Sequence, residues 1–430
     1  MQNPPFQPSD APLGAAGSPG EPLRDASGDG AAPLSIERHR KQFPALTEKV
    51  YLNYGGQGPL PWTAIDAMQQ ATEYLQQIGP FSEAANLWIM EETRELRAAI
   101  AGELGVAAET IALTENVSVG CNIALWGLDW QPGDHLLLSD CEHPSVLGAV
   151  QELQRRFHIQ VSTCPLMATL NGGDPVAVIA RALQPKTRLV ALSHILWNTG
   201  QVLPLREIVA VCHDYRGDRG PVRVLVDAAQ SVGVLPLNLA DLGVDFYAFT
   251  GHKWWCGPAG VGGLYIHPEA LEGLHPTFIG WRGITATPQG DPIGWKTGSW
   301  RFEVATSDYS LYSGLGAAIV THQQWGLPED VYTRLKSLSG WLWEKLQTLP
   351  TVSCLKQEPP EAGLVSFQIT GYDQASYGQV HQKLVRFLEY QGIMVRTIRH
   401  PDCVRACVHY LTTEADLDRL VTTIAAFQLE

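Results

Sequence analysis

The chain has 430 residues, of which 45% are hydrophobic and 17% charged, and its formal net charge at pH 7 is -14. This length allows two or three domains with a substantial buried core. The acidic balance argues against nucleic acid or an anionic membrane as the partner, because neither would be attracted to such a surface. Without an apolar run of about 18 residues or a secretory signal pattern, the sequence predicts a soluble, cytoplasmic protein.

Eight cysteines are scattered along the chain without a Cys-x-x-Cys pair, which is a poor match to a disulfide framework or a zinc ribbon. We therefore expect mostly reduced, buried thiols. Cys403 and Cys407 lie near His400 and His409. A Cys-x3-Cys spacing without a second ligand pair does not favour a metal, so we expect no metal site.

The N-terminal part of the chain begins with 34 residues rich in Pro, Gly, Ala, Ser and Asp. These residues bury too little apolar surface to offset the entropy of ordering, so we expect a flexible tail. A helix-like segment (35–43) and a short apolar stretch (50–53) follow. The glycines of 54–61 permit close approach of a ligand to backbone amides, although a plain loop is the simpler interpretation of these residues alone. Residues 62 to about 104 show a helical pattern.

Apolar runs then alternate with helical stretches. The strand candidates span 111–114, 135–139, 159–164, 188–193, 222–226, 245–249 and 263–267. Strands that are apolar nearly throughout and alternate with helices predict a mostly parallel sheet covered on both faces.

Beyond about residue 305 the pattern changes. A long helical region (about 307–348) precedes strand candidates at 363–369, 392–396 and 403–410, which are interleaved with helices at about 377–391 and 413–427. This arrangement predicts a compact α+β domain that is smaller than the first.

Lys253 follows the strand candidate at 245–249 and precedes a Gly/Pro-rich loop, so the chain places a lysine at a strand end. Chemistry in α/β sheets gathers at that edge. An arbitrary lysine is most often a solvated surface residue. Here Phe249, Trp254 and Trp255 flank it, and partial desolvation would lower its pKa toward the neutral amine that Schiff-base chemistry needs.

Asp227 and Gln230 follow the strand candidate at 222–226. Pyridoxal 5'-phosphate (PLP) needs an amine for its aldehyde, an anion that keeps the ring nitrogen protonated, and donors for its phenolic oxygen and phosphate. The sequence therefore predicts a PLP site with Asp227 as the anion and Gln230 as the phenolate donor. Capping of the next helix is the alternative role of Asp227, and its combination with Lys253 favours the cofactor.

The run Val-Asp-Ala-Ala-Gln-Ser (226–231), followed by Thr-Gly-His-Lys (250–253), resembles the signature of the fold type I, class V aminotransferase-like enzymes, which include cysteine desulfurases. The resemblance extends from about residue 50 to 420. It implies a PLP-dependent transferase-like α/β fold, with a mostly parallel sheet in the large domain and a smaller α+β C-terminal domain. We expect a tail (1–34), an N-terminal segment associated with the small domain (35–62), a large PLP-binding domain (63–304) and a small domain (305–430).

The resemblance also implies roles for individual residues. Lys253, His143 and Asp227 would be catalytic, and the cofactor would be bound by Val117, Ser118, His143, Asp227, Gln230, Thr250, His252, Lys253 and Thr306. The amide of Val117 and Ser118 would hold the phosphate at a helix N-terminus. His143 corresponds to an imidazole that stacks on the cofactor ring, although a lone histidine there is more typical of a structural or capping residue.

Thr306 matches a threonine that reaches the phosphate of the other subunit, which implies an obligate homodimer with shared sites. The family's asparagine aligns with Trp197, and Asn198 follows one place later, so that contact is left open.

For the substrate, the resemblance implies contacts from Gly55, Arg396 and Arg405. An arginine fork binds an amino-acid carboxylate in a bidentate geometry that lysine would not reproduce. A surface ion pair is the simpler interpretation of either arginine alone.

Cysteine desulfurases carry a nucleophilic cysteine on a loop between these two arginines. Here the interval is short, the usual cysteine position is Pro401, and Cys403 lies two residues before Arg405 at the expected start of a strand. We expect Cys403 to be a buried structural thiol. The chain then looks most like the cyanobacterial cysteine/cystine C-S lyases, with Trp254, Trp281 and Arg282 as candidate walls for the leaving half. Aromatic core packing explains the tryptophans equally well.

This resemblance implies PLP-dependent β-elimination of cystine or cysteine to pyruvate, ammonia and a sulfide or persulfide, which a sulfur acceptor would take for iron-sulfur cluster assembly. The alternatives are an alanine-forming cysteine desulfurase that uses Cys403, another class V activity such as an aminotransferase or epimerase, and a catalytically inactive binding protein.

Overall fold

The computed structural model describes residues 35–371 and 377–428 of the chain. Its largest sheet has seven strands in the order β2-β10-β9-β8-β5-β3-β4. Only β10 runs against its neighbours β2 and β9, and the other pairs are parallel. The predicted mostly parallel sheet is confirmed. The strands are β2 (Ile111–Thr114), β3 (His135–Ser139), β4 (Gln160–Cys164), β5 (Thr187–Ser193), β8 (Arg223–Asp227), β9 (Phe246–Thr250) and β10 (Gly262–Ile266).

Helices cover both faces of this sheet, because successive strand residues point to opposite sides. In β9, Phe246 and Ala248 belong to one apolar core, whereas Tyr247 and Phe249 belong to the other. The first core includes α4 (Val117–Gly127), α5 (Pro144–Phe157) and α9 (Pro268–Leu271). The second core includes α3 (Glu83–Leu104), α6 (Pro175–Ala182), α7 (Leu205–Asp214) and α10 (Ser310–Gln323). The double covering explains why the strands are apolar throughout.

The C-terminal part is built on a four-stranded antiparallel sheet in the order β13-β14-β17-β16. These strands are β13 (Val352–Cys354), β14 (Leu364–Ile369), β17 (Asp402–Cys407) and β16 (Arg396–Arg399). They share an apolar core with α11 (Pro328–Gln347), α12 (Tyr377–Tyr390) and α13 (Glu414–Ala425).

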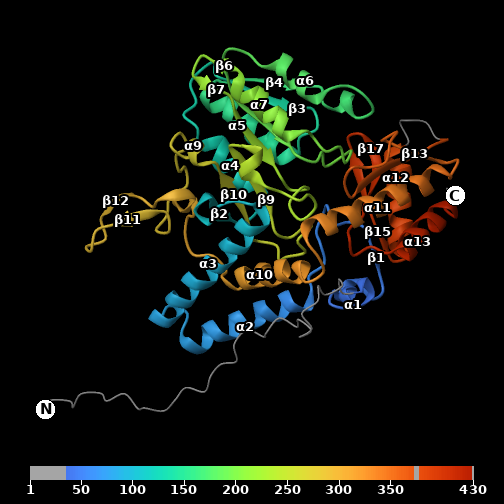
Figure 1. Ribbon diagram of the computed structural model, residues 1–430, viewed down its shortest axis with the longest axis horizontal. Helices are drawn as coiled ribbons and strands as arrows, with labels where there is room; N and C mark the ends of the chain where they lie inside the picture. Colours follow the sequence, from blue (N-terminus) through green and yellow to red (C-terminus); the bar gives the residue numbers. More distant parts are fainter. Residues whose placement is uncertain (1–34, 372–376, 429–430) are drawn as a thin grey trace.

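The N-terminal segment joins this C-terminal part. Strand β1 (Val50–Tyr51) pairs in parallel with β15 (Ile393–Met394), and the Cys407 amide donates to the Leu52 carbonyl at 2.7 Å. Val50 and Leu52 lie in the same core as α11 and β17. The N-terminal segment therefore packs against the C-terminal part before the chain continues into α2 (Trp62–Ile78) (Figure 1).

Two features depart from the sequence prediction. The helical region of about 307–348 is two helices, and α10 packs on α2 and α3 of the first part (Figure 1). A hairpin of β11 (Ile284–Ala286) and β12 (Pro292–Trp295) projects from the body (Figure 1), with β12 exposed throughout. Sequence reasoning missed this hairpin because it has no buried face, and burial produces the alternation that marks a strand.

The remaining short elements connect these units. They are α1 (Ile36–Arg40), α8 (Leu239–Leu242), the strand pair β6 (Arg216–Gly217) and β7 (Gly220–Pro221), and single 3-10 turns at Pro44–Leu46, Ala108–Thr110, Met167–Thr169 and Gly298–Phe302. Within the described ranges, each helix is too short or too polar to cross a membrane.

A buried hydrogen-bond network joins the N-terminal segment, α10 and the C-terminal part. The Tyr410 hydroxyl lies 2.9 Å from His39 Nε2 and 2.6 Å from His322 Nδ1. His322 Nε2 lies 2.8 Å from the Trp255 carbonyl, and His409 Nε2 lies 3.1 Å from the Trp254 carbonyl. Because Trp254 and Trp255 follow Lys253 directly, this network fixes the loop that carries the lysine.

Candidate active site

Lys253 lies just beyond the carboxyl end of β9, where the chain turns away from the sheet. Burial lowers its pKa to about 8, although the nearby charge of Asp227 acts in the opposite direction. The glycine loop at 55–58 packs on its backbone, because a Cβ on Gly58 would stand 2.2 Å from the Lys253 carbonyl oxygen. The predicted lysine at a strand end is thus partly desolvated, and its amine is shifted toward the neutral form.

Asp227 ends β8, the neighbouring strand, in register with Ala248 of β9. Its carboxylate is 8% exposed, and Oδ1 accepts the Ala229 amide at 3.0 Å. The charge of this carboxylate acts to raise the pKa of both Lys253 and His143. Adjacent parallel strands therefore place the anion and the amine at the same sheet edge.

Gln230 is buried between the glycine loop and Trp254. Its Nε2 donates to the Gly55 carbonyl at 3.0 Å, and its Oε1 accepts the Trp254 indole N–H at 2.9 Å. The amide is therefore fixed in one orientation, and the second hydrogen on Nε2 is left for another acceptor.

The start of α4 and the end of β9 form a polar cup. Asn116 caps α4 by accepting the Val119 amide at 3.1 Å, while Val117 and Ser118 occupy the first helical positions, whose amides have no partner inside a helix. A Cβ on Gly262 would stand 3.0 Å from Thr250 Cα and 3.3 Å from Asn116 Cα, so the two chain segments are close. Such a helix N-terminus favours an anion.

Thr250 and His252 form the other side of this cup. Thr250 Oγ1 and His252 Nδ1 lie 2.6 Å apart. Burial and the Lys253 charge lower the pKa of His252 to about 4, so its imidazole is neutral near pH 7. A neutral imidazole still donates one N–H, which suits a phosphate oxygen.

His143 caps α5, with its Nδ1 accepting the Ser145 amide at 3.3 Å. The capping role that we held as the alternative is therefore present in the geometry. The ring is exposed and meets the Trp197 ring edge-on, with centroids 5.3 Å apart. Burial lowers its pKa, and the charge of Asp227 opposes this effect. A capping bond at Nδ1 leaves Nε2 and the ring face available.

Arg396 and Arg405 face each other across the β16–β17 pair. Arg405 is 1% exposed, its Nη1 donates to the Trp197 carbonyl at 2.5 Å, and its Nε has no hydrogen-bond partner among the described residues. Arg396 is exposed, and its positive charge contributes to lowering the pKa of Lys253. The buried guanidinium with a free N–H is suited to receive an anionic group.

Cys403 lies at the start of β17, as the sequence predicted, and is fully buried. Burial raises the pKa of its thiol to about 12. The turn from β16 to β17 contains only His400 and Pro401, so the structure has no long loop between the two arginines. More broadly, the described residues hold no cluster of three or more His, Cys, Asp or Glu that could bind a metal.

Three further residues join the site without having been predicted for it. Glu142 is buried beside Asp227, where its carboxylate accepts the Ser193 hydroxyl at 2.9 Å, and burial raises its pKa to about 8. Trp197 contacts both His143 and Arg405. Cys407 also lies there, and its position two residues after Arg405 was a signal, because alternate residues of a strand share a face. Glu142 carried no such signal, whereas Trp197 stands where the family's asparagine aligns, a contact that the sequence left open.

The other candidates lie less centrally. Thr306 is exposed and makes no hydrogen bond to the described part of the chain. Arg282 is committed to Glu303, with Nη2 and Oε2 2.6 Å apart, and Arg97 pairs with the same carboxylate. Trp281 is 58% exposed, whereas Trp254 is buried. Within one chain, Arg282 is therefore part of a buried ion-pair cluster.

The sequence model for aminotransferase class-V matches residues 50–420, most of the chain and all of the site residues named above. The chain belongs to the aminotransferase class-V family. A cysteine desulfurase of Klebsiella pneumoniae (strain 342) is 28% identical over 412 residues, covering 90% of this chain and 97% of the relative.

Among solved structures, the class-V chain is similar to the cystine C-S lyase C-DES in complex with its reaction product cysteine persulfide. The identity is 51% and the TM-score 0.87, with 90% of this chain and 100% of that chain covered. A C-DES lysine-to-alanine mutant with glycine covalently linked to the PLP cofactor matches equally well, with 99% of that chain covered. The cysteine desulfurase CsdA from Escherichia coli, at 23% identity and a TM-score of 0.78, shares the fold.

The residues of this class-V site fit PLP. Lys253 provides an amine with a lowered pKa, and Asp227 provides a buried carboxylate. The polar cup formed by the α4 N-terminus, Thr250 and His252 suits the phosphate. Among the residues that the structure describes, none accepts a hydrogen bond from the buried Nε of Arg405, which suits a substrate carboxylate beside the cofactor.

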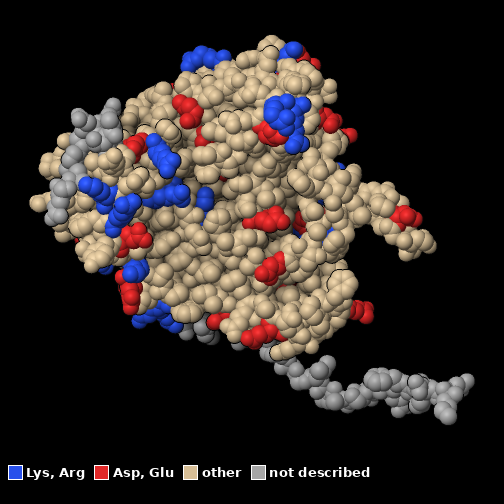
Figure 2. Space-filling model, turned by 180° about the vertical axis from the view of Figure 1, so that it is seen from behind, with Lys and Arg blue, Asp and Glu red and all other residues tan. Residues whose placement is uncertain are grey.

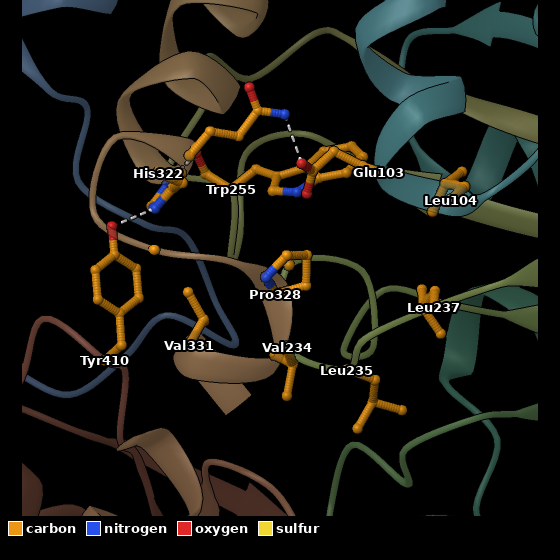
Figure 3. A pocket seen from close by; sticks show the side chains of 13 residues that line it. Glu103, Leu104, Val234, Leu235, Leu237, Trp255, His322, Pro328, Val331 and Tyr410 are labelled. Carbon is orange, nitrogen blue, oxygen red and sulfur yellow. Dashed lines mark hydrogen bonds between the residues drawn. The ribbon is translucent and has the colours of Figure 1, made fainter. Parts of the chain in front are cut away.

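A separate pocket is lined in part by Trp255, which follows Lys253 by two residues (Figure 3). Glu103, Val234, Trp255 and Pro328 line it, and the hydrogen bond between His322 and Tyr410 forms part of its wall (Figure 3). Since its lining contains none of the candidate cofactor residues, the pocket is distinct from the active site.

Proposed function

We propose that this protein is a PLP-dependent carbon-sulfur lyase that cleaves L-cystine or L-cysteine by β-elimination. The products are pyruvate, ammonia and a sulfide or persulfide. Membership of the class-V family and similarity to the cystine C-S lyase C-DES at 51% identity support the proposal. The arrangement of Lys253, Asp227 and Arg405 supplies the groups that this chemistry needs.

PLP, when bound, supplies an electron sink that acidifies the Cα proton of an amino acid joined to it. The role of Lys253 is to hold the cofactor and then to accept the Cα proton. An amine with a pKa of about 8 is partly neutral near pH 7, so it can accept that proton. Asp227 places its carboxylate at the cofactor end of β8, while Val117, Ser118, Thr250 and His252 would hold the phosphate.

The substrate carboxylate binds at Arg405, with Arg396 and Gly55 beside it. A buried guanidinium binds a carboxylate more tightly than an exposed one, because water competes less for its N–H groups. This contact orients the Cα–H bond toward Lys253. His143, which meets Trp197 edge-on, would contact the cofactor ring with its exposed imidazole.

One observation carries the choice of elimination over desulfuration: the two-residue turn that joins β16 to β17. A desulfurase nucleophile must travel to the substrate sulfur. Cys403 is buried in a strand whose residues 402–405 are paired with β16, and its thiol is held protonated by burial. It has neither the freedom nor the ionisation for that attack.

Substitution of Cys403 tests this choice. Cys403→Ser should still release pyruvate from cystine, at a rate within about threefold of wild type, because the side chain has no chemical role. The measurement is a coupled pyruvate assay on the PLP-loaded protein. Loss of all sulfur release in Cys403→Ser would instead favour the alanine-forming desulfurase.

We also propose a homodimer whose active sites are shared, with Thr306 reaching the phosphate bound by the partner chain. Large apolar side chains are exposed near Thr306, among them Phe278, Ile279, Trp281 and Val304. The face turned away from the viewer of Figure 1 has few charged side chains across its centre, while Lys and Arg gather over the C-terminal part (Figure 2). Exposed apolar patches of this kind are typical of subunit interfaces.

We also propose a cytoplasmic location, delivery of sulfur to an acceptor for iron-sulfur cluster assembly, and a division into segments 35–62, 63–304 and 305–430. The separate core around β17 supports the last of these, although α10 packs with the larger part.

A further inference from the structure

Cys407 lies on the face of β17 that is turned toward Lys253. Along this strand, Val404 and Ala406 point into the core of the C-terminal part, so Arg405 and Cys407 share the opposite face. Cys407 packs in the buried cluster that contains Tyr54 and Trp254. The proposed substrate-binding arginine and this thiol therefore lie on the same face of β17.

The glycine loop shows how close the two groups are. A Cβ placed on Gly55 would stand 2.8 Å from Arg405 Nη2, 2.9 Å from Cys407 Sγ and 2.9 Å from Gln230 Oε1. Both the guanidinium and the sulfur are thus packed around one point of the backbone. A ligand that reaches Arg405 also comes near Sγ of Cys407.

One observation points to a ligand at this spot, and a second places Cys407 near the reacting centre. Arg405 is 1% exposed, and its Nε has no acceptor among the described residues, so a buried positive group awaits an anion. Cys407 also bears on the charge of Lys253, the residue at the reacting centre. Cys403 lies near the other end of β17, and its sulfur neighbours Ser366.

We propose that Cys407 is a persulfidation site: its thiol takes the sulfane sulfur from the persulfide product, and Arg405 holds the resulting persulfide anion. The inference rests on the proposed function, since elimination from cystine supplies the persulfide. The sulfur-sulfur bond of the product breaks as a new one forms to Cys407 Sγ. The thiol proton passes to the departing cysteine sulfur, and no oxidant or reductant is consumed.

This modification has a consequence for turnover. A persulfide anion paired with Arg405 occupies the group that binds the substrate carboxylate. The modified protein therefore binds cystine more weakly until a thiol acceptor removes the sulfur. We expect KM for cystine to be about tenfold higher in the modified protein, as for the loss of one hydrogen bond to a charged group.

The test is peptide mapping of the PLP-loaded wild-type protein after reaction with cystine and removal of small molecules. We expect the peptide that contains Cys407 to be one sulfur atom heavier and to lose that mass with dithiothreitol. Cys403→Ser, on the same strand face, serves as the matched control and should gain the same mass, whereas Cys407→Ser should not. Mapping of the wild-type protein needs no variant, so misfolding of Cys407→Ser cannot hide the answer.

A second arm separates this inference from the proposed function. The wild-type protein is given cysteine persulfide directly, which bypasses elimination. Extra sulfur on the Cys407 peptide supports the site even if no pyruvate forms from cystine. An unmodified Cys407 peptide in this arm, or sulfur found only on another cysteine, overturns it.

Discussion

At the scale of single residues, the site depends on Lys253, a half-buried residue whose amine has a lowered pKa. Burial lowers the pKa of Lys253 to about 8, so the protonated fraction falls as pH rises through that value. Capture of PLP requires the neutral amine. We expect the apoprotein to bind PLP faster as pH is raised from 7 to 9, levelling off above about 8.

Stopped-flow absorbance at the wavelength of the lysine-bound cofactor measures this rate. Lys253→Ala should abolish that absorbance and lower pyruvate formation by about 10³-fold or more, because it removes both attachment and the proton acceptor. A capture rate that does not change between pH 7 and 9 would contradict the assigned amine.

Gly55 offers a second test at this scale. A Cβ in Gly55→Ala would stand within 3 Å of Arg405, Cys407 and Gln230, so these side chains must shift. Overpacking of this kind costs about 1–3 kcal/mol, and we expect KM for cystine to rise about tenfold or more. Gly102→Ala is the control, because nothing lies within 4 Å of its Cβ. Equal KM values for the two variants would show that Gly55 has no part in substrate binding.

Lys253, Asp227 and Gln230 could be proposed as cofactor residues from the sequence because they follow strand ends, and the structure places Lys253 and Asp227 at the same sheet edge. The sequence could not predict Glu142, whose surroundings come from Ser139 and Ser193 on different strands. It also could not decide the role of His143, since the cap on α5 and the exposed ring face coexist. Such roles depend on side-chain orientation, which periodicity does not determine.

At the scale of elements, the buried network around Tyr410 fixes the lysine loop against α10 and the C-terminal part. Tyr410→Phe removes the hydroxyl that His39 and His322 share. Each unpaired buried group costs about 1–3 kcal/mol. Tyr410→Phe should therefore lower the free energy of unfolding, measured by urea titration, by that amount or more. Tyr390→Phe, at a side chain 89% exposed, should change the free energy of unfolding by less than about 0.5 kcal/mol.

The same network makes the free energy of unfolding depend on pH. Burial lowers the pKa of His39 to about 4 and of His322 to about 3, whereas both titrate near 6.5 when unfolded. Between these values the unfolded chain binds protons that the folded chain does not. The free energy of unfolding should therefore fall as pH is lowered from about 6.5 to about 4.

His39→Gln isolates one of these groups. The variant should reduce the slope of the free energy of unfolding against pH by about 1.4 kcal/mol per pH unit, which corresponds to one proton. Urea titrations at pH 7, 6 and 5 measure the slope. An identical slope in wild type and variant would mean that His39 is not held neutral by the fold.

The elements of the large sheet were predictable because apolar runs of strand length are bounded by Gly and Pro. Strand β9 and the loop after it agree with the expected boundaries within one residue. The β11–β12 hairpin was not predictable, because its side chains remain in solvent in the single chain. Burial of the hairpin against another chain would leave no periodic pattern in its sequence.

At the scale of the whole molecule, the proposed homodimer places the exposed apolar segment around Trp281 and Val304 against a second chain. A Cβ on Gly280 would stand 2.0 Å from the Val304 carbonyl oxygen, so the two strips of chain form one packed surface. Trp281→Asp puts a charge into that surface and should weaken the dimer by at least about tenfold in Kd.

Sedimentation velocity measures the dimer directly. Tyr390→Asp, an exposed aromatic residue of α12, is the matched control and should remain dimeric. If Thr306 completes the phosphate site of the partner, the monomeric variant should also lose PLP. A wild-type monomer that retains PLP would contradict the shared site.

The central claim is elimination rather than desulfuration, and the partition between two three-carbon products tests it most directly. Purified, PLP-loaded protein is incubated with cystine and, separately, with cysteine, and pyruvate and alanine are quantified in the same samples. The locked position of Cys403 in β17 predicts pyruvate with ammonia and little alanine. Alanine as the main product would contradict the account.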